Sequence, residues 1–163
     1  MDSEILKQLS ELTISRDRIE FSIGDTYDIK ASIVLVIATF LASLCGSILS
    51  IEGLAIPIRW LQLFVITSLV VSVVYCFRVL WLQDYRLEAN PKKIQEWLEP
   101  KVISGELDVE KALRLQLAAA QNRITVNRQF NQKKSDRLEK AFIGAFVAFG
   151  FQAVSLLCLL PGL

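Results

Sequence analysis

The chain has 163 residues, of which 53% are hydrophobic, and its mean hydropathy is +0.43. This value is high for a soluble domain and low for a protein made only of membrane spans, so we expect three spans and an aqueous helical part. The net charge is only +1, so the placement of charge is more informative than its total. The absence of histidine excludes histidine-based acid–base catalysis and histidine metal ligands.

The three cysteines do not indicate a disulfide or a metal site. Cys45, Cys76 and Cys158 lie far apart in sequence, and each falls in an apolar run. This placement favours reduced core residues over disulfides or a zinc site.

The first segment, residues 1–28, is charged and polar. Apolar residues recur along residues 2–21 at steps of four and three, which predicts an amphipathic helix that needs a partner surface. Gly24 and Asp25 predict a break after this helix.

A transmembrane hairpin is predicted over residues 29–82. Residues 31–51 carry no charge, which is enough length to cross ~30 Å of hydrocarbon. A second uncharged run begins at Trp60, and we place the second span over about 60–82. Glu52-Gly53 predicts the turn between the spans.

Residues 83–140 are the long charged connection. We predict a short helix over 91–98, a turn at Ser104-Gly105 and a helix cap at Asp108.

The C-terminal third predicts one long helix that starts in water and ends in lipid. Neither Gly nor Pro occurs between Asp108 and Lys140, and no charged residue occurs from Ala141 onward. The third span is therefore residues 141–163.

A stripe at heptad spacing runs along this helix and predicts packing along a shared seam. One alternative is a symmetric bundle of several copies, with a tetramer favoured; the other is packing against the chain's own helices. The seam residues are Leu113, Leu117, Ile124, Asn127, Asn131 and Leu138. In a bundle the membrane part of the stripe would line a pore with Ala145, Ala148, Gln152 and Ser155.

Basic and amide side chains gather before the third span. No acid occurs between Arg123 and Lys134, so this run can hold phosphate groups. The alternatives are a solvated face or contact with anionic headgroups. The candidate anion- or nucleotide-binding residues are Arg123, Arg128, Lys133, Lys134 and Arg137.

The distribution of Lys and Arg predicts the topology. Residues 78–140 hold thirteen of them and residues 1–30 hold four, whereas the turn between the first two spans holds only Arg59. The positive-inside rule places the N-terminus and the long connection in the cytoplasm and the C-terminus outside.

Motifs of enzymes are missing from the sequence. It contains no P-loop, Gly-rich dinucleotide turn, nucleophile elbow or metal-ligand cluster. We therefore expect neither an enzyme nor a bound cofactor.

Two segments resemble a known family. The start of the first span, Asp28-Ile29-Lys30-Ala31-Ser32-Ile33-Val34-Leu35, and the run Asn122–Ala141 are similar to the transmembrane domain of Pycsar-type effectors of bacterial anti-phage defence. The order of two spans, a helical segment and another span is also similar. A related possibility is the channel subunit of a Hailong-type system.

The resemblance implies a toxin-like effector of the bacterial inner membrane. A nucleotide or oligonucleotide from a partner nucleotidyltransferase would control it, and it would arrest growth by permeabilising the membrane. Our first hypothesis is thus an oligomeric ion-conducting channel that depolarises the membrane. The alternative is a non-conducting scaffold that recruits a cytoplasmic partner. The subunit number, the ligand, the direction of gating and the span that lines the pore stay open.

Overall fold

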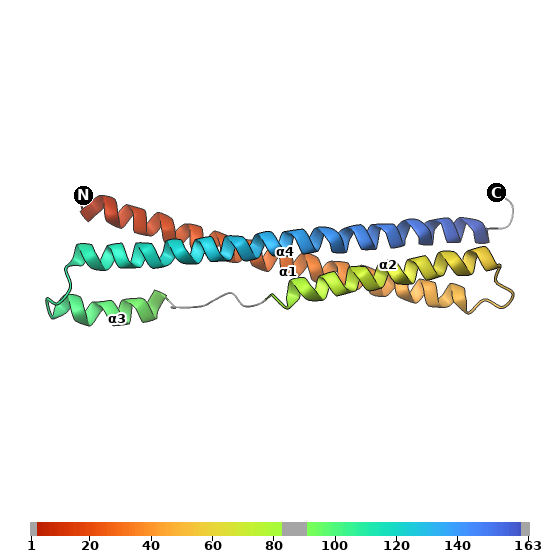
Figure 1. Cartoon of the computed structure of the whole chain (residues 1–163), viewed down its shortest axis with the longest axis horizontal. Coiled ribbons are helices and arrows are strands. Elements are labelled where there is room, and N and C mark those ends of the chain that lie inside the picture. The colour runs from red at the N-terminus through yellow and green to blue at the C-terminus, as the bar shows by residue number, and fades with distance from the viewer. Residues whose placement is uncertain (1–2, 83–90, 161–163) are drawn as a thin grey trace. The chain divides into compact units, whose positions relative to one another are not determined.

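The computed structural model describes residues 3–82 and 91–160 (Figure 1). These residues form four α-helices and no strand, which confirms the predicted all-α fold for this part of the chain. The helices are α1 (Ser3–Leu49), α2 (Ile56–Leu80), α3 (Pro91–Ile103) and α4 (Val109–Leu159).

The chain divides into two compact units, and α1 and α4 contribute to both. The polar unit contains residues 3–25 and 91–132 of the described chain. The membrane unit contains residues 26–82 and 133–160.

Three helices are long and apolar enough to cross a membrane. They are α1, α2 and α4, each of which contains an 18-residue apolar window with at most two charged residues. Such a window is ~27 Å long, close to the thickness of the hydrocarbon layer. The protein is therefore a multi-pass membrane protein.

Local sequence signals set most of the helix boundaries. Pro57 lies in the first turn of α2, where its missing N–H removes no helical hydrogen bond. Gly53 and Gly105 have φ angles of 76° and 75°, so each predicted turn contains a glycine in the left-handed region. The N–H of Ala112 donates to the carbonyl of Asp108 at 3.0 Å, and α4 begins one residue after Asp108, as predicted.

Two predicted boundaries are wrong. α1 continues through Gly24 and Asp25 instead of breaking there. One glycine in a helix costs only about 1 kcal/mol relative to alanine, which a long helix tolerates. The boundary between the two units within α1 nevertheless falls between Asp25 and Thr26. α3 also extends to Ile103 and includes Pro100, where we predicted a helix over 91–98.

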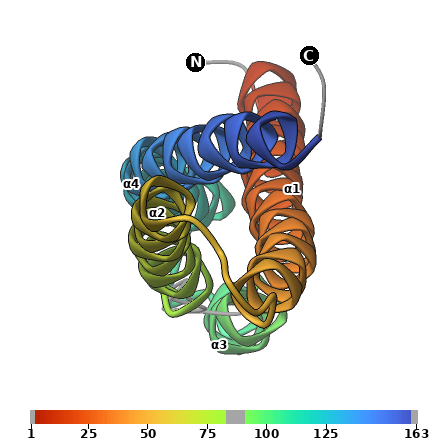
Figure 2. The same cartoon turned by 90° about the vertical axis from the view of Figure 1, so that its right-hand side faces the viewer.

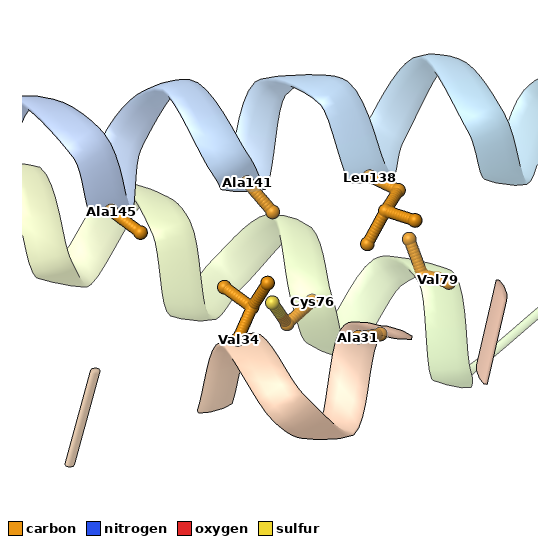
Figure 3. Close-up of a cluster of buried hydrophobic side chains, with 7 residues drawn as sticks. All are labelled: Ala31, Val34, Cys76, Val79, Leu138, Ala141 and Ala145. Carbon is orange, nitrogen blue, oxygen red and sulfur yellow. The ribbon is translucent and has the colours of Figure 1, made fainter. Parts of the chain in front are cut away.

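Small and medium side chains from α1, α2 and α4 fill the centre of the membrane unit. Figure 2 shows the ribbons of these helices end-on. Figure 3 shows one cluster, to which all three helices contribute. Its members are Ala31, Val34, Cys76, Val79, Leu138, Ala141 and Ala145. A second cluster continues along the same helices with Ala38, Leu41, Cys45, Val65, Leu69 and Ala148. Alanines on α4 allow the helix backbones to approach closely, as is typical of helix contacts in lipid.

Large apolar side chains cover the outside of the membrane unit. On α4, Phe142, Phe146 and Phe149 are exposed, and on α1 Val36 and Phe40 are exposed. An outer surface of this kind is expected where lipid is the solvent. The membrane unit thus has small side chains inside and large ones outside.

Gly144 marks the closest approach of α4 to α2. A Cβ added there would lie 3.1 Å from the carbonyl oxygen of Ser68 and 3.2 Å from the backbone nitrogen of Ser72. Backbone atoms cannot move aside as a flexible side chain can. The same addition at Gly150 would meet no atom within 4 Å.

These two glycines give a matched stability prediction. Gly144→Ala should lower the thermal unfolding temperature of the detergent-solubilised protein, because the helices must separate by a few tenths of an ångström. Gly150→Ala should leave it unchanged or raise it, because alanine is the better helix former by ~1 kcal/mol. Equal effects of the two substitutions would contradict the close α2–α4 contact.

Candidate functional site: the polar seam of α4

The seam of α4 is buried in the membrane unit. Lys134, Ala148 and Ser155 have no exposed surface, and Ala145 and Gln152 are 7% and 2% exposed. The chain's own α1 and α2 cover this face. All four predicted pore-lining residues therefore point into the membrane unit rather than toward its surface.

Two glutamines and a serine form a polar cluster at one end of this seam. Gln62 of α2 is fully buried, and its Nε2 donates to Oγ of Ser155 at 2.6 Å. Oε1 of Gln62 and both amide atoms of Gln152 have no hydrogen-bond partner. An unpartnered buried polar group costs about 1–3 kcal/mol, so this cluster is a strained part of the membrane unit.

Gln62 was missed by the sequence analysis. A signal was present, because this amide interrupts the apolar run of the second span. What the sequence lacked was the pairing of Gln62 with Ser155, which lies 93 residues further along the chain.

One further polar contact joins α2 to α4 between the two ends of the seam. Oγ of Ser72, which is fully buried, donates to the carbonyl oxygen of Ala141 at 2.8 Å. This bond satisfies the serine without adding a charge.

An ion pair forms the other end of the seam. Nζ of Lys134 donates to both carboxylate oxygens of Asp28, at 2.7 and 2.8 Å. The lysine side chain is fully buried, and the carboxylate side chain is 25% exposed. Burying an ammonium group removes its hydration, and the two hydrogen bonds to the Asp28 carboxylate offset part of that cost.

The two polar ends of the seam are separated by about the thickness of the hydrocarbon layer. Lys134 and Ser155 are separated by 21 helical steps, or ~32 Å, compared with ~30 Å for hydrocarbon. Between them the seam offers Ala141, Ala145 and Ala148, which the two apolar clusters cover. In the single chain, apolar side chains therefore leave no polar path along the middle of the seam.

In the polar unit the seam contacts α1 through polar side chains. Oδ2 of Asp17 lies 3.3 Å from Nε of Arg123, and both side chains are largely buried. Nδ2 of Asn131 donates to the carbonyl and the carboxylate of Glu20, at 2.8 and 2.9 Å. Asn127 is 1% exposed, and its Nδ2 has no hydrogen-bond partner.

The apolar seam residues are less deeply buried in this unit. Leu113, Leu117 and Ile124 are half-buried, whereas Leu138 in the membrane unit is 4% exposed. In each unit the chain's own helices contact the seam, which is one of the two arrangements that its heptad spacing allows. The symmetric bundle stays a prediction.

The five candidate anion-binding residues fall into three environments. Arg123 and Lys134 face the carboxylates of α1, and Arg137 donates from Nη1 to the carbonyl of Arg78 at 2.8 Å. Arg128 and Lys133 are exposed. Two of the five side chains are therefore exposed at the surface.

Comparisons with known proteins give no relative. No family model, no curated protein and no solved structure matches the chain. Among the residues that the structure describes, no group of three or more Cys, Asp or Glu side chains could hold a metal ion.

The Asp28–Lys134 pair makes a stability prediction. Asp28→Asn and Lys134→Met should each destabilise the protein by roughly 3 kcal/mol, because each removes one charge of the pair and leaves the other charge without it. The double variant Asp28→Asn with Lys134→Met should recover much of that loss, since it removes both charges. A double-mutant cycle of unfolding in detergent measures the coupling.

The exposed pair Glu110–Arg114, with side chains 42% and 61% exposed at a distance of 2.6 Å, is the matched control. Glu110→Gln should cost under about 1 kcal/mol. Additive effects at Asp28 and Lys134 would contradict the ion pair.

Proposed function

We propose that the protein is an oligomeric membrane effector that conducts ions along the polar seam of α4. The observation that carries the proposal is a pair of buried amides inside a membrane-spanning unit: Oε1 of Gln62 and both amide atoms of Gln152 lack a hydrogen-bond partner. Polar groups within spans are costly and usually mark a pathway or a working site. In a conducting conformation these amides would form hydrogen bonds with water or with another subunit, and this would account for their presence in the spans.

The described arrangement fits a closed state. Cluster residues such as Val34, Leu41 and Leu69 close the space beside the alanines of the seam. Conduction then requires α1 or α2 to move away from α4, so that the seams of several copies face a shared axis. Amide and hydroxyl groups without a fixed charge would give weak ion selectivity.

The basic residues of α4 are the proposed regulatory site of this channel. Arg128 and Lys133 are exposed cations, which favour an anionic ligand such as a nucleotide or an oligonucleotide. The resemblance to anti-phage effectors supplies the biological setting: a tetramer in the bacterial inner membrane, with its N-terminus in the cytoplasm, which depolarises the cell and arrests growth.

A second candidate function is a membrane scaffold without conduction. It is favoured by apolar side chains that are exposed on the polar unit: Leu12, Ile19, Trp97 and Ile103 are 55–82% exposed. A surface that binds a partner is typically a contiguous patch of such residues, and these four would contribute to one.

Gln152→Leu separates the two functions. In cells that express the protein from an inducible promoter, we expect this variant to abolish depolarisation of the membrane, measured with a voltage-sensitive dye. It should also raise the thermal stability of the purified protein by up to about 2 kcal/mol, because leucine needs no hydrogen-bond partner. The rise in stability shows that the loss of current does not come from misfolding.

The control variants are Gln152→Asn, which keeps the amide, and Phe149→Leu, which changes an exposed residue of the same helix. Both should still depolarise the cells. Undiminished depolarisation by Gln152→Leu, at equal amounts of protein in the membrane fraction, would remove the seam from the pathway. A wild-type protein that leaves the potential unchanged when it is assembled and supplied with its signal would favour the scaffold.

Charge reversal tests the anion site. Arg128→Glu combined with Lys133→Glu should weaken binding of a fluorescent oligonucleotide at least tenfold and make the residual binding less sensitive to salt. Lys134 is left unchanged, because its reversal would disrupt the pair with Asp28. Reversal at the exposed residues Lys111 and Arg114 is the control, and equal losses in both double variants would show attraction without a site.

A further inference from the structure

A groove runs between α2 and α4 on the surface of the membrane unit. Its volume is about 350 Å³, and its lining is mainly apolar. Val71 on α2 and Ile143 and Val147 on α4 form its walls, and Gly144 lies between the helices. The groove ends at Tyr75 and Lys140.

Cations gather at that end of the groove. Nζ of Lys140 lies 5.6 Å from the centroid of the Tyr75 ring, and Cζ of Arg78 lies 5.8 Å from the same centroid. Both distances are within the range of cation–π attraction. The hydrogen bond of Arg137 to the carbonyl of Arg78 adds a third cation close by.

The local acids do not neutralise this end. Asp136 and Glu139 are exposed on α4, and in the part of the chain that the structure describes neither forms an ion pair with Arg78 or Lys140. Both cations lie within 6 Å of the same ring centroid, so their charges add at this end of the groove and would attract an anion.

We propose that this groove binds one anionic phospholipid. One acyl chain would lie along Val71, Ile143 and Val147, and the phosphate would accept hydrogen bonds from Lys140 and Arg78 beside Tyr75. The apolar groove and the cationic end match the two parts of such a lipid in the order in which a bilayer presents them. A guanidinium group can donate two parallel hydrogen bonds to a phosphate. A tyrosine at the membrane interface places its ring at the level of the lipid headgroups.

This site differs from the proposed conduction path. The groove is on the outer surface between α2 and α4, whereas Gln62, Gln152 and Ser155 are buried inside the unit. The lipid would stabilise the contact of α2 with α4 whether or not the protein conducts.

A second groove, between α1 and α2, gives the contrast. It is larger, about 470 Å³, and its lining contains no charged residue. Val74 lies in this second groove and Val71 in the first, and both are 44% exposed on the same helix. The two valines therefore form a matched pair for substitution.

The test uses the full chain in nanodiscs that contain phosphatidylglycerol and phosphatidylcholine in equal amounts. After transfer to detergent, native mass spectrometry counts the lipids that stay bound. We expect the wild type to retain phosphatidylglycerol at least fivefold over phosphatidylcholine. The double variant Lys140→Gln with Arg78→Gln should lose that preference.

Two matched controls accompany the test. Lys30→Gln with Arg59→Gln removes the same charge from exposed residues outside the groove and should keep the preference. Val71→Phe, which fills the groove without changing charge, should reduce bound phosphatidylglycerol at least threefold, and Val74→Phe should not. Thermal unfolding of each variant in lipid-free detergent confirms that it is folded.

Three results would overturn the proposal. The first is equal retention of the two lipids by the wild type. The second is full retention of phosphatidylglycerol by the Lys140 and Arg78 double variant. The third is displacement of the lipid by millimolar glycerol 3-phosphate, which would assign binding to the cations alone and leave no role for the groove.

Discussion

The membrane unit depends on the rule that a polar group in hydrocarbon must find its partner within the protein. Asp28 satisfies Lys134 with two short hydrogen bonds, and the carbonyl of Ala141 satisfies Ser72. Gln62 is satisfied only in part, and neither amide atom of Gln152 has a hydrogen-bond partner. The Asp28–Lys134 and Ser72–Ala141 contacts fix how α1 and α2 pack against α4. The unsatisfied amides lie where a different arrangement of the helices would add hydrogen bonds.

The size of the side chains on α4 determines what that arrangement can be. Alanines and a glycine bring α4 close to its neighbours, so that a methyl group added at Gly144 would lie 3.1–3.2 Å from backbone atoms of α2, which is tighter than ordinary contact. Packing of this kind is held by close contact and not by bulky interlocking side chains. A small-residue seam permits close approach of a helix backbone, whether that helix belongs to the same chain or, in the proposed channel, to another copy.

Much of the secondary structure was predictable from local patterns. Uncharged runs located the three spans, and glycines at positions 53 and 105 located the turns. The break expected at Gly24 failed, because a weak local signal was overridden by helix continuity on both sides. Of the candidate site, the stripe on α4 was predictable from heptad spacing. Gln62 and Asp28 were not placed opposite it, because they belong to other helices.

The sequence by itself determined which segments are helical, which of them can cross a membrane, and which side chains share the seam of α4. These properties depend on neighbours within a few turns, where spacing and charge decide the outcome. Only the tertiary structure decided what the seam faces. Lys134 could have met a nucleotide, a lipid or a carboxylate, and it pairs with Asp28 from 106 residues away, because packing in three dimensions selects partners that no local pattern specifies.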